Sequence, residues 1–246
     1  MLSPEERERY ARHILLKEVG GPGQQRLKVA AAAIVGAGGL GAPAALYLAA
    51  AGAGRLRLID HDTVALSNLQ RQIIFRTDDA GAPKTERAAA ALAALNPHVA
   101  VEARTERLTE HNARALLAGV DLVLDGTDDF ATRFAVNAAC QALRIPLVSG
   151  AVGRWEGQVS VFTPGGPCYR CFVPEIPPDA ETCAQVGIVG ALPGVIGSLM
   201  ALEAIKHIAE AGETLAGRVL LFDGLAATAR TVRLKRDPDC PVCGHD

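Results

Sequence analysis

Four of the six cysteines stand in two Cys-x-x-Cys pairs, Cys168/Cys171 and Cys240/Cys243, which lie on either side of residues 172–239. Four thiolates are the ligand set of a tetrahedral structural zinc ion. A redox dithiol is the alternative, but that use favours a pair at a helix start in a thioredoxin-like βαβ unit, a context that neither pair shows. Because four protein ligands leave no open coordination position on the zinc ion, we expect zinc to hold the C-terminal tail against the core without taking part in catalysis.

The two remaining cysteines stand in different surroundings. Cys140 lies in an apolar segment, 130–143, and is expected to be a small buried hydrophobe. Cys183 lies in a polar, proline-rich segment, where a thiol is nucleophilic if its pKa is lowered. The alternative for Cys183 is an incidental exposed cysteine, which the residues alone favour.

A glycine-rich stretch fits the phosphate-binding pattern G-x-G-x-x-G, with glycines at Gly36, Gly38, Gly39 and Gly41. It stands between a β-like run and a helical segment, the context that gives the pattern its meaning. A helix that begins there offers free N–H groups and a positive dipole to phosphate. Asp60 ends the next β-like run, where a carboxylate accepts from ribose hydroxyls. The stretch therefore predicts nucleotide binding, against the alternative that the glycines only permit close packing and Asp60 caps a loop.

The segments that follow decide between nucleotides. Ser67–Gln72 is polar with Arg71 near its end, and Lys84 begins a predicted helix. These cations suit a triphosphate better than the pyrophosphate of NAD, although each alone would pass for a solvated surface charge. Asp128 follows a buried β-like run, where a carboxylate is a plausible Mg²⁺ ligand. Helix capping by Asp128 or Asp129 is an equally good interpretation of the spacing.

The elements that must position these residues alternate along the chain. Strands are expected at 28–35, 56–60, 99–103, 120–125 and 145–149, and helices at 3–19, 39–51, 84–95, 109–117 and 130–143. This alternation is typical of a doubly wound parallel sheet. After residue 150 we expect a strand at 158–163, a helix at 189–209 and a hairpin of 218–222 and 228–235. The predicted fold is α/β: a Rossmann-like doubly wound sheet, parallel in its N-terminal half and continued by antiparallel strands, with the tail held by the four-cysteine zinc site.

Composition excludes several classes of protein. The 246 residues are 49% apolar and 21% charged, which excludes a disordered chain, and 25 basic against 27 acidic residues give a net charge of −2. No nucleic-acid partner is expected from that balance. The N-terminus has no basic and apolar leader, and Ser3 and Glu6 there predict a capping box. Two apolar runs, 29–54 and 186–202, are broken by glycine and proline, so we expect a cytoplasmic protein without membrane contact.

Taken together, the motifs resemble the MoeB/ThiF adenylyltransferases, relatives of the ubiquitin-activating enzymes. The resemblance covers essentially the whole chain, and no single piece carries it. Its pieces are Arg-Tyr-x-Arg at 9–12, the glycine-rich turn 36–41, Asp60, Ser67–Gln72, Lys84, Thr127-Asp128, Cys-Tyr-Arg-Cys at 168–171, and Cys240/Cys243.

The resemblance implies an activity and a set of roles. Members bind ATP and Mg²⁺ and adenylylate the C-terminal glycine of a ubiquitin-like sulfur carrier with a Gly-Gly end, of the molybdopterin or thiamine type, and release pyrophosphate. By resemblance, Asp60 holds the ribose, Asn68, Arg71 and Lys84 contact the phosphates, and Asp128 binds Mg²⁺. Arg12 reaches into the partner subunit's site, which implies a homodimer; a surface charge is the alternative for Arg12. Cys183 matches a loop cysteine that resembles a sulfur-linking residue.

Two departures and two rival functions accompany the resemblance. Asp129 stands where the family often has Asn, which adds a negative charge beside the phosphates or simply caps the helix. The chain ends soon after Cys243, so a separate sulfur donor protein is expected.

We expect one domain, 1–246, with an N-terminal helix in 1–20, a nucleotide-binding half in 28–150 and a carrier-binding and zinc half in 151–246. The alternatives are an NAD-dependent oxidoreductase and a non-catalytic, zinc-stabilised module that binds a ubiquitin-like partner.

Overall fold

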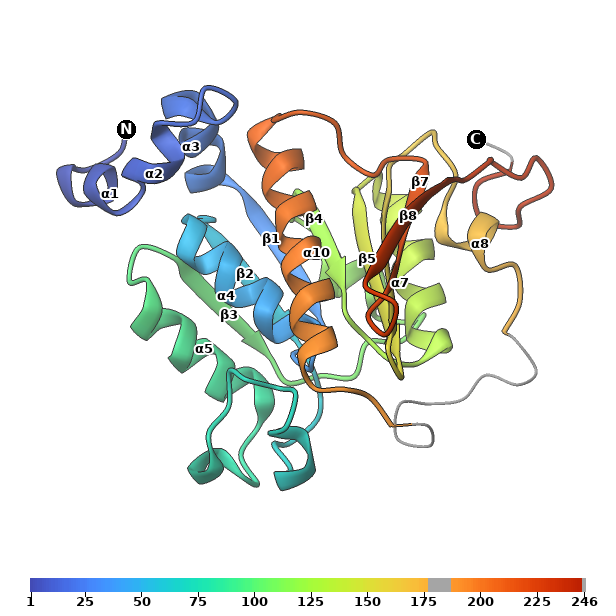
Figure 1. Ribbon diagram of the computed structural model, residues 1–246, viewed down its shortest axis with the longest axis horizontal. Coiled ribbons are helices and arrows are strands. Elements are labelled where there is room, and N and C mark those ends of the chain that lie inside the picture. Colours follow the sequence, from blue (N-terminus) through green and yellow to red (C-terminus); the bar gives the residue numbers. More distant parts are fainter. Residues whose placement is uncertain (177–186, 245–246) are drawn as a thin grey trace.

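A computed structural model describes residues 1–176 and 187–244 (Figure 1). Its strands form one eight-stranded sheet in the order β3-β2-β1-β4-β5-β6-β7-β8. Strands β1 to β5 pair in parallel, and β5 to β8 pair antiparallel. The strands are β1 (Ala31–Val35), β2 (Arg55–Ile59), β3 (Ala100–Arg104), β4 (Leu122–Asp125), β5 (Leu147–Gly153), β6 (Glu156–Phe162), β7 (Arg218–Asp223) and β8 (Thr228–Arg233). The expected parallel half with an antiparallel continuation is confirmed.

Helices cover both faces of the sheet, as Figure 1 shows. Alternate residues of β1 enter different cores: Ala32 and Ile34 pack on one side, and Ala33 and Val35 on the other. This period-two burial on both faces is what a central parallel strand requires. One side carries α4 (Gly41–Ala51), α5 (Lys84–Leu95) and α10 (Ala191–Ala209), and the other carries α6 (Ala113–Leu117) and α7 (Phe130–Leu143).

Helix α10 is long and apolar enough, by length and composition, to cross a membrane. Here it is a core helix that packs against α4, β5 and β6. Its buried side chains include Ile196 and Met200, and the glycines Gly150 and Gly157 leave room for them on the sheet.

The N-terminal segment differs from the expected single helix 3–19. It forms α1 (Pro4–Arg9), α2 (Ala11–Ile14) and α3 (Gly20–Val29), so a helix begins at Gly20 where one was expected to end. The chain turns at Tyr10, whose buried hydroxyl accepts from Asn96 Nδ2 at 2.8 Å. Docking of that side chain overrides local helix propensity. The capping box is confirmed: Ser3 Oγ accepts from Glu6 N, and Glu6 Oε2 accepts from Ser3 N.

Several other boundaries also differ from the expected ones. Helix α3 continues to Val29, so β1 begins at Ala31 instead of residue 28. Helix α6 begins at Ala113 instead of Thr109, because Asn112 Oδ1 accepts from Thr109 N at 2.8 Å and stabilises a local turn there.

Candidate functional site

A pocket lies beyond the carboxyl ends of β1, β2 and β4, the edge where open α/β sheets bind ligands. Residues from the glycine-rich turn, the segment after β2, the start of α5 and the start of α7 line it. The sequence-predicted members of its wall are Gly36, Gly38, Gly39, Asp60, Arg71, Lys84, Asp128 and Asp129.

The glycine-rich turn is built by close approach between backbone segments. Gly36 has φ +85°, which favours glycine. A Cβ on Gly41 would lie 1.8 Å from the carbonyl oxygen of Gly36, so no larger residue fits while the turn keeps this shape. Gly41 lies outside the pocket wall, and its close approach to Gly36 is the packing that was the alternative at this motif; a contribution of Gly41 to nucleotide binding stays a prediction.

Asp60 joins the turn to the next strand. The side chain is buried, its Oδ2 accepts from Ala37 N at 2.8 Å, and its Oδ1 accepts from Asp62 N at 2.8 Å. The two backbone donors fix the carboxylate against the pocket wall.

Lys84, the first residue of α5, is buried, and its Nζ lies 2.8 Å from Asp62 Oδ2. The pKa of Asp62 is lowered: burial raises it, but the hydrogen bond and charge of Lys84, together with the charges of His61 and Arg107, outweigh burial. Arg71 is half-buried, and its Nη1 donates to Ser67 O at 3.1 Å. The structure thus brings two cations from separate segments to one pocket.

Three predicted site residues lie elsewhere. Asn68 is outside the pocket wall, and its Oδ1 accepts from Ala65 N at 3.1 Å. Arg12 lies on α2, which packs against α3, and is likewise absent from the wall. Cys183 lies outside the described residues.

At the end of β4 the two adjacent acids differ in position. Asp129 is the N-cap of α7, and its Oδ1 accepts from Thr132 N at 2.8 Å, so the capping interpretation holds for this residue. Asp128 is exposed at the pocket, and no helix among the described residues has it as its cap. Of the two carboxylates, Asp128 is the one free to meet a ligand.

The four paired cysteines form one cluster whose sulfur atoms all lie within 4.8 Å of one another. Cys168 Sγ lies 3.6 Å from Cys240 Sγ, and Cys171 Sγ lies 3.4 Å from Cys243 Sγ. A tetrahedral zinc with Zn–S bonds of about 2.3 Å has sulfur atoms about 3.8 Å apart, so this donor set fits zinc.

The surroundings of the cluster also suit thiolates. Asn137 Nδ2 donates to Cys168 Sγ at 3.6 Å, and Asp237 N donates to Cys171 Sγ at 3.4 Å. Donors to ligating atoms are the outer contacts that orient metal ligands.

The local structure around Cys168 differs from the expected one. Cys168 is the N-cap of a four-residue helix, α8 (Tyr169–Phe172), so the first pair does stand at a helix start, contrary to our expectation. It follows an antiparallel strand, β6, and so lacks the βαβ context of redox dithiols. Cys140 is buried as expected, and burial first, then Asp125, raises its thiol pKa.

A family model described as "ThiF family" matches residues 10–242. The chain belongs to the ThiF family. The pocket, the glycine-rich turn and three of the four clustered cysteines fall inside the matched range, and Cys243 lies just beyond it.

Two relatives and one solved structure place this ThiF-family chain further. It is 48% identical to the sulfur carrier protein adenylyltransferase of Thermus thermophilus, over 98% of this chain and 92% of that protein. It is 46% identical to the molybdopterin-synthase adenylyltransferase of Escherichia coli K12, over 99% of both chains. A crystal structure of Escherichia coli MccB with MccA-N7isoASN has a TM-score of 0.87 at 24% identity, covers 99% of this chain and 75% of that one, and confirms the fold.

The ThiF-family pocket contains residues that the sequence analysis missed. His61, Asp62, Arg107 and Arg133 line the wall, and so does Gln72, whose Oε1 is buried with no hydrogen-bond partner in the described structure. Gln72 stood within the polar segment that was singled out, and a lone arginine in the apolar segment 130–143 was a signal that Arg133 has a buried partner. Arg107 had no comparable signal in the sequence. It follows β3, an edge strand, and its segment is separated in sequence from the glycine-rich turn and from the end of β4.

Proposed function

We propose that this ThiF-family protein is an adenylyltransferase that uses ATP and Mg²⁺ to adenylylate the C-terminal glycine of a ubiquitin-like sulfur carrier. The observation that carries the proposal is the meeting of Lys84, Arg71 and Asp128 on one glycine-rich pocket. Relatives of similar length that are named sulfur carrier and molybdopterin-synthase adenylyltransferases support it.

In the proposed reaction the carrier's terminal carboxylate attacks the α-phosphorus of ATP, and pyrophosphate leaves as an acyl-adenylate forms. Lys84 and Arg71 neutralise the phosphate charge that grows on the leaving group, and Asp60 holds the ribose. Asp128 would hold Mg²⁺, which offsets further phosphate charge. The chain contributes position and charge and needs no covalent group for this step. Asn68 would have to turn from Ala65 N to reach a phosphate.

Charge distinguishes ATP from the dinucleotide of the rival oxidoreductase. Lys84 and Arg71 suit a ligand with more negative charge than the pyrophosphate bridge of NAD. We expect ATP to bind and NADH to compete poorly. Tight NADH binding without ATP binding would reverse this order.

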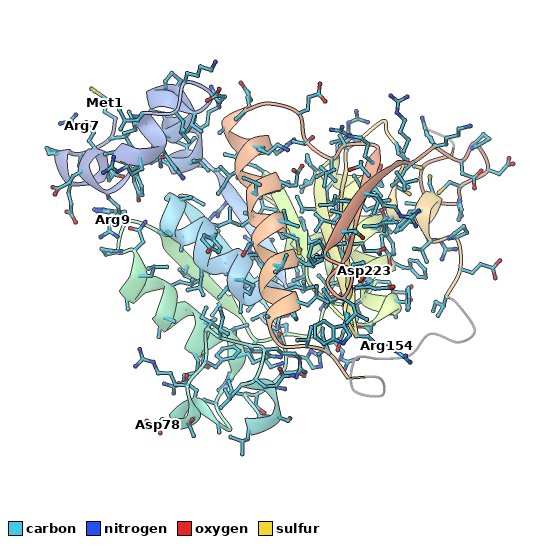
Figure 2. All side chains as sticks on the ribbon, viewed as in Figure 1. Met1, Arg7, Arg9, Asp78, Arg154 and Asp223 are labelled. Atoms are coloured by element: carbon cyan, nitrogen blue, oxygen red, sulfur yellow. The ribbon has the colours of Figure 1, made fainter. Side chains whose placement is uncertain are left out.

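The deciding experiment is carrier-dependent exchange of labelled pyrophosphate into ATP. Wild-type protein with a Gly-Gly-ended carrier should exchange, and Asp128→Ala should abolish exchange. Asp78→Ala is the matched control, because Asp78 is exposed at the outer end of the segment after β2 (Figure 2) and lies outside the pocket. Carrier binding without exchange by wild-type protein would support the non-catalytic module, and exchange that persists in Asp128→Ala would exclude the Mg²⁺ role.

The placement of Arg12 outside its own pocket motivates a homodimer in which Arg12 acts in the partner subunit's site. Mixing inactive Arg12→Ala and Asp128→Ala proteins tests this, because a mixed dimer has one site with both residues intact. After subunit exchange, roughly a quarter of the sites should be active. Exchange activity that stays absent would contradict the proposal.

The remaining roles are proposals of the same kind. Zinc held by Cys168, Cys171, Cys240 and Cys243 would stabilise the fold and supply no step. Cys183 would act in a later sulfur-transfer step, so Cys183→Ser should leave adenylylation intact and block the later conjugate; unchanged sulfuration would make it incidental. The carrier's pathway, a separate sulfur donor, a cytoplasmic location and the single-domain division stay predictions.

A further inference from the structure

Arg133 is a charged residue in the first turns of α7 that the proposed reaction does not use. Arg133 is 7% exposed and lies one helical turn after Asp129, the N-cap of α7. Burial opposes the charge on Arg133, yet Asp125, Tyr169 and Asp128 together raise its pKa. A buried guanidinium that stays charged needs partners with fixed geometry, and the structure supplies them on two sides.

The first side is the turn that ends β4. Arg133 Nη2 donates to the carbonyl oxygen of Thr127, while Asp125 Oδ1 accepts from Thr127 N at 3.0 Å and from Thr127 Oγ1 at 2.7 Å. Both polar groups of the Thr127 backbone and its hydroxyl are therefore held by the side chains of two buried residues, Arg133 and Asp125. The next residue is Asp128, whose carboxylate faces the pocket.

The second side is the cysteine cluster. Tyr169, which follows Cys168 and is 2% exposed, interacts with Arg133, and this interaction helps to raise the pKa of Arg133. Tyr169 N in turn donates to Asn137 Oδ1 at 2.9 Å, and Asn137 Nδ2 donates to Cys168 Sγ. The rings of Phe134 and Tyr169, 5.9 Å apart, pack α7 against α8. One buried network thus joins the cysteine cluster to the turn that carries Asp128.

We propose that Arg133 is a positioning residue that holds the 126–128 turn, and with it the Asp128 carboxylate, at a place set by Tyr169 and the cysteine cluster. This inference rests on the proposed function, because Asp128 is there the Mg²⁺ ligand. A guanidinium suits the task because its planar fork donates to the Thr127 carbonyl in a fixed direction while its charge stays beside Asp125, which a flexible lysine ammonium does not reproduce. Small displacements of a catalytic carboxylate have large effects on rate.

The test measures how strongly Mg²⁺ tightens ATP binding, by calorimetry with and without the metal, in four zinc-replete proteins: wild type, Arg133→Met, Asp128→Ala and the double variant. If Arg133 acts through Asp128, Arg133→Met should reduce the Mg²⁺ effect about tenfold in the wild-type background and not at all in the Asp128→Ala background. Equal effects in both backgrounds, or an unchanged Mg²⁺ effect with only a lower Tm, would overturn the proposal.

Two milder variants keep the test valid if Arg133→Met folds poorly. Tyr169→Phe removes only the hydroxyl and should weaken the Mg²⁺ effect while zinc content stays the same. Arg133→Lys keeps the charge beside Asp125 and should give an intermediate effect. The surface control is Arg114→Met, on the exposed face of α6, which should match wild type. A Mg²⁺ effect unchanged in both Tyr169→Phe and Arg133→Lys would contradict the positioning role of Arg133. A wild type that shows no Mg²⁺ effect would contradict the proposed function instead.

Discussion

The buried ammonium group of Lys84 lies 2.8 Å from the carboxylate of Asp62, so this cation of the pocket is held by a carboxylate that is half exposed. Lys84 comes from α5 and Asp62 from the segment after β2, and the pair fixes where the positive charge stands. An anionic ligand that enters the pocket meets this charge already oriented, which reduces the ordering that binding requires.

We expect Lys84→Met to weaken ATP binding about ten- to hundredfold, because a charge-assisted hydrogen bond to phosphate is lost. Calorimetric titration with ATP measures the change. Asp62→Asn is the comparison: it removes the competing carboxylate and keeps the ammonium group, so ATP binding should not weaken. A loss in Asp62→Asn as large as in Lys84→Met would show that the orienting carboxylate matters as much as the charge it orients, and would contradict this prediction.

We expect Gly41→Ala to lower the free energy of unfolding by at least about 2 kcal/mol, because its Cβ would overlap the carbonyl oxygen of Gly36. Gly194→Ala is the matched control, since a Cβ there meets nothing within 4 Å and alanine favours the helix. Urea unfolding should show destabilisation for the first variant and a small gain for the second. Equal stability of both variants would mean that the turn opens easily.

Loss of the cysteine cluster should lower Tm by about 5 °C or more, because a structural zinc site contributes folding free energy. Chelation and Cys240→Ser are the two ways to remove it. Cys140→Ala, a buried cysteine outside the cluster, should keep full zinc content. Metal analysis and thermal unfolding measure these effects. Freshly purified protein without zinc, with a Tm indifferent to chelator, would refute the assignment.

The Glu6–Lys28 pair gives a pH-dependent contribution to stability. Lys28 first, then Ser3, lowers the pKa of Glu6 from 4.5 to about 2 against the effect of burial. A depressed folded pKa adds stability above the unfolded value, and this gain is lost as pH falls from about 4.5 toward 2. Glu6→Gln should therefore cost about 1 kcal/mol at pH 7, reduced by the partial exposure of Lys28, and progressively less below pH 4.5.

Urea unfolding at pH 7, 5 and 4 measures this difference. Glu8→Gln, on the exposed face of α1, should match wild type at every pH. A Glu6→Gln deficit that does not shrink with falling pH would show that the effect is packing and not charge.

Much of the fold follows from local pattern, and the largest failure, in the N-terminal segment, has a long-range cause. Helices α5 and α7 begin and end where the apolar spacing and the Asn96-Pro97 stop predicted. The N-terminal segment failed because the break at Tyr10 is set by its contact with Asn96, far along the chain. A long-range hydrogen bond of this kind leaves no mark in the periodicity of its own segment.

The sequence by itself determined the family, the order of parallel and antiparallel strands, and the residue types of both sites, because periodicity, glycine spacing and cysteine pairs are local features. Only the tertiary structure decided which candidates meet. It brought Cys168 and Cys171 together with Cys240 and Cys243. It also showed that Asp129 caps α7 while Asp128 does not, and that Arg12 lies outside the pocket of its own chain. It also placed the buried Arg133 between the two sites. These outcomes depend on distances between segments remote in sequence, which the packing of helices on the sheet sets.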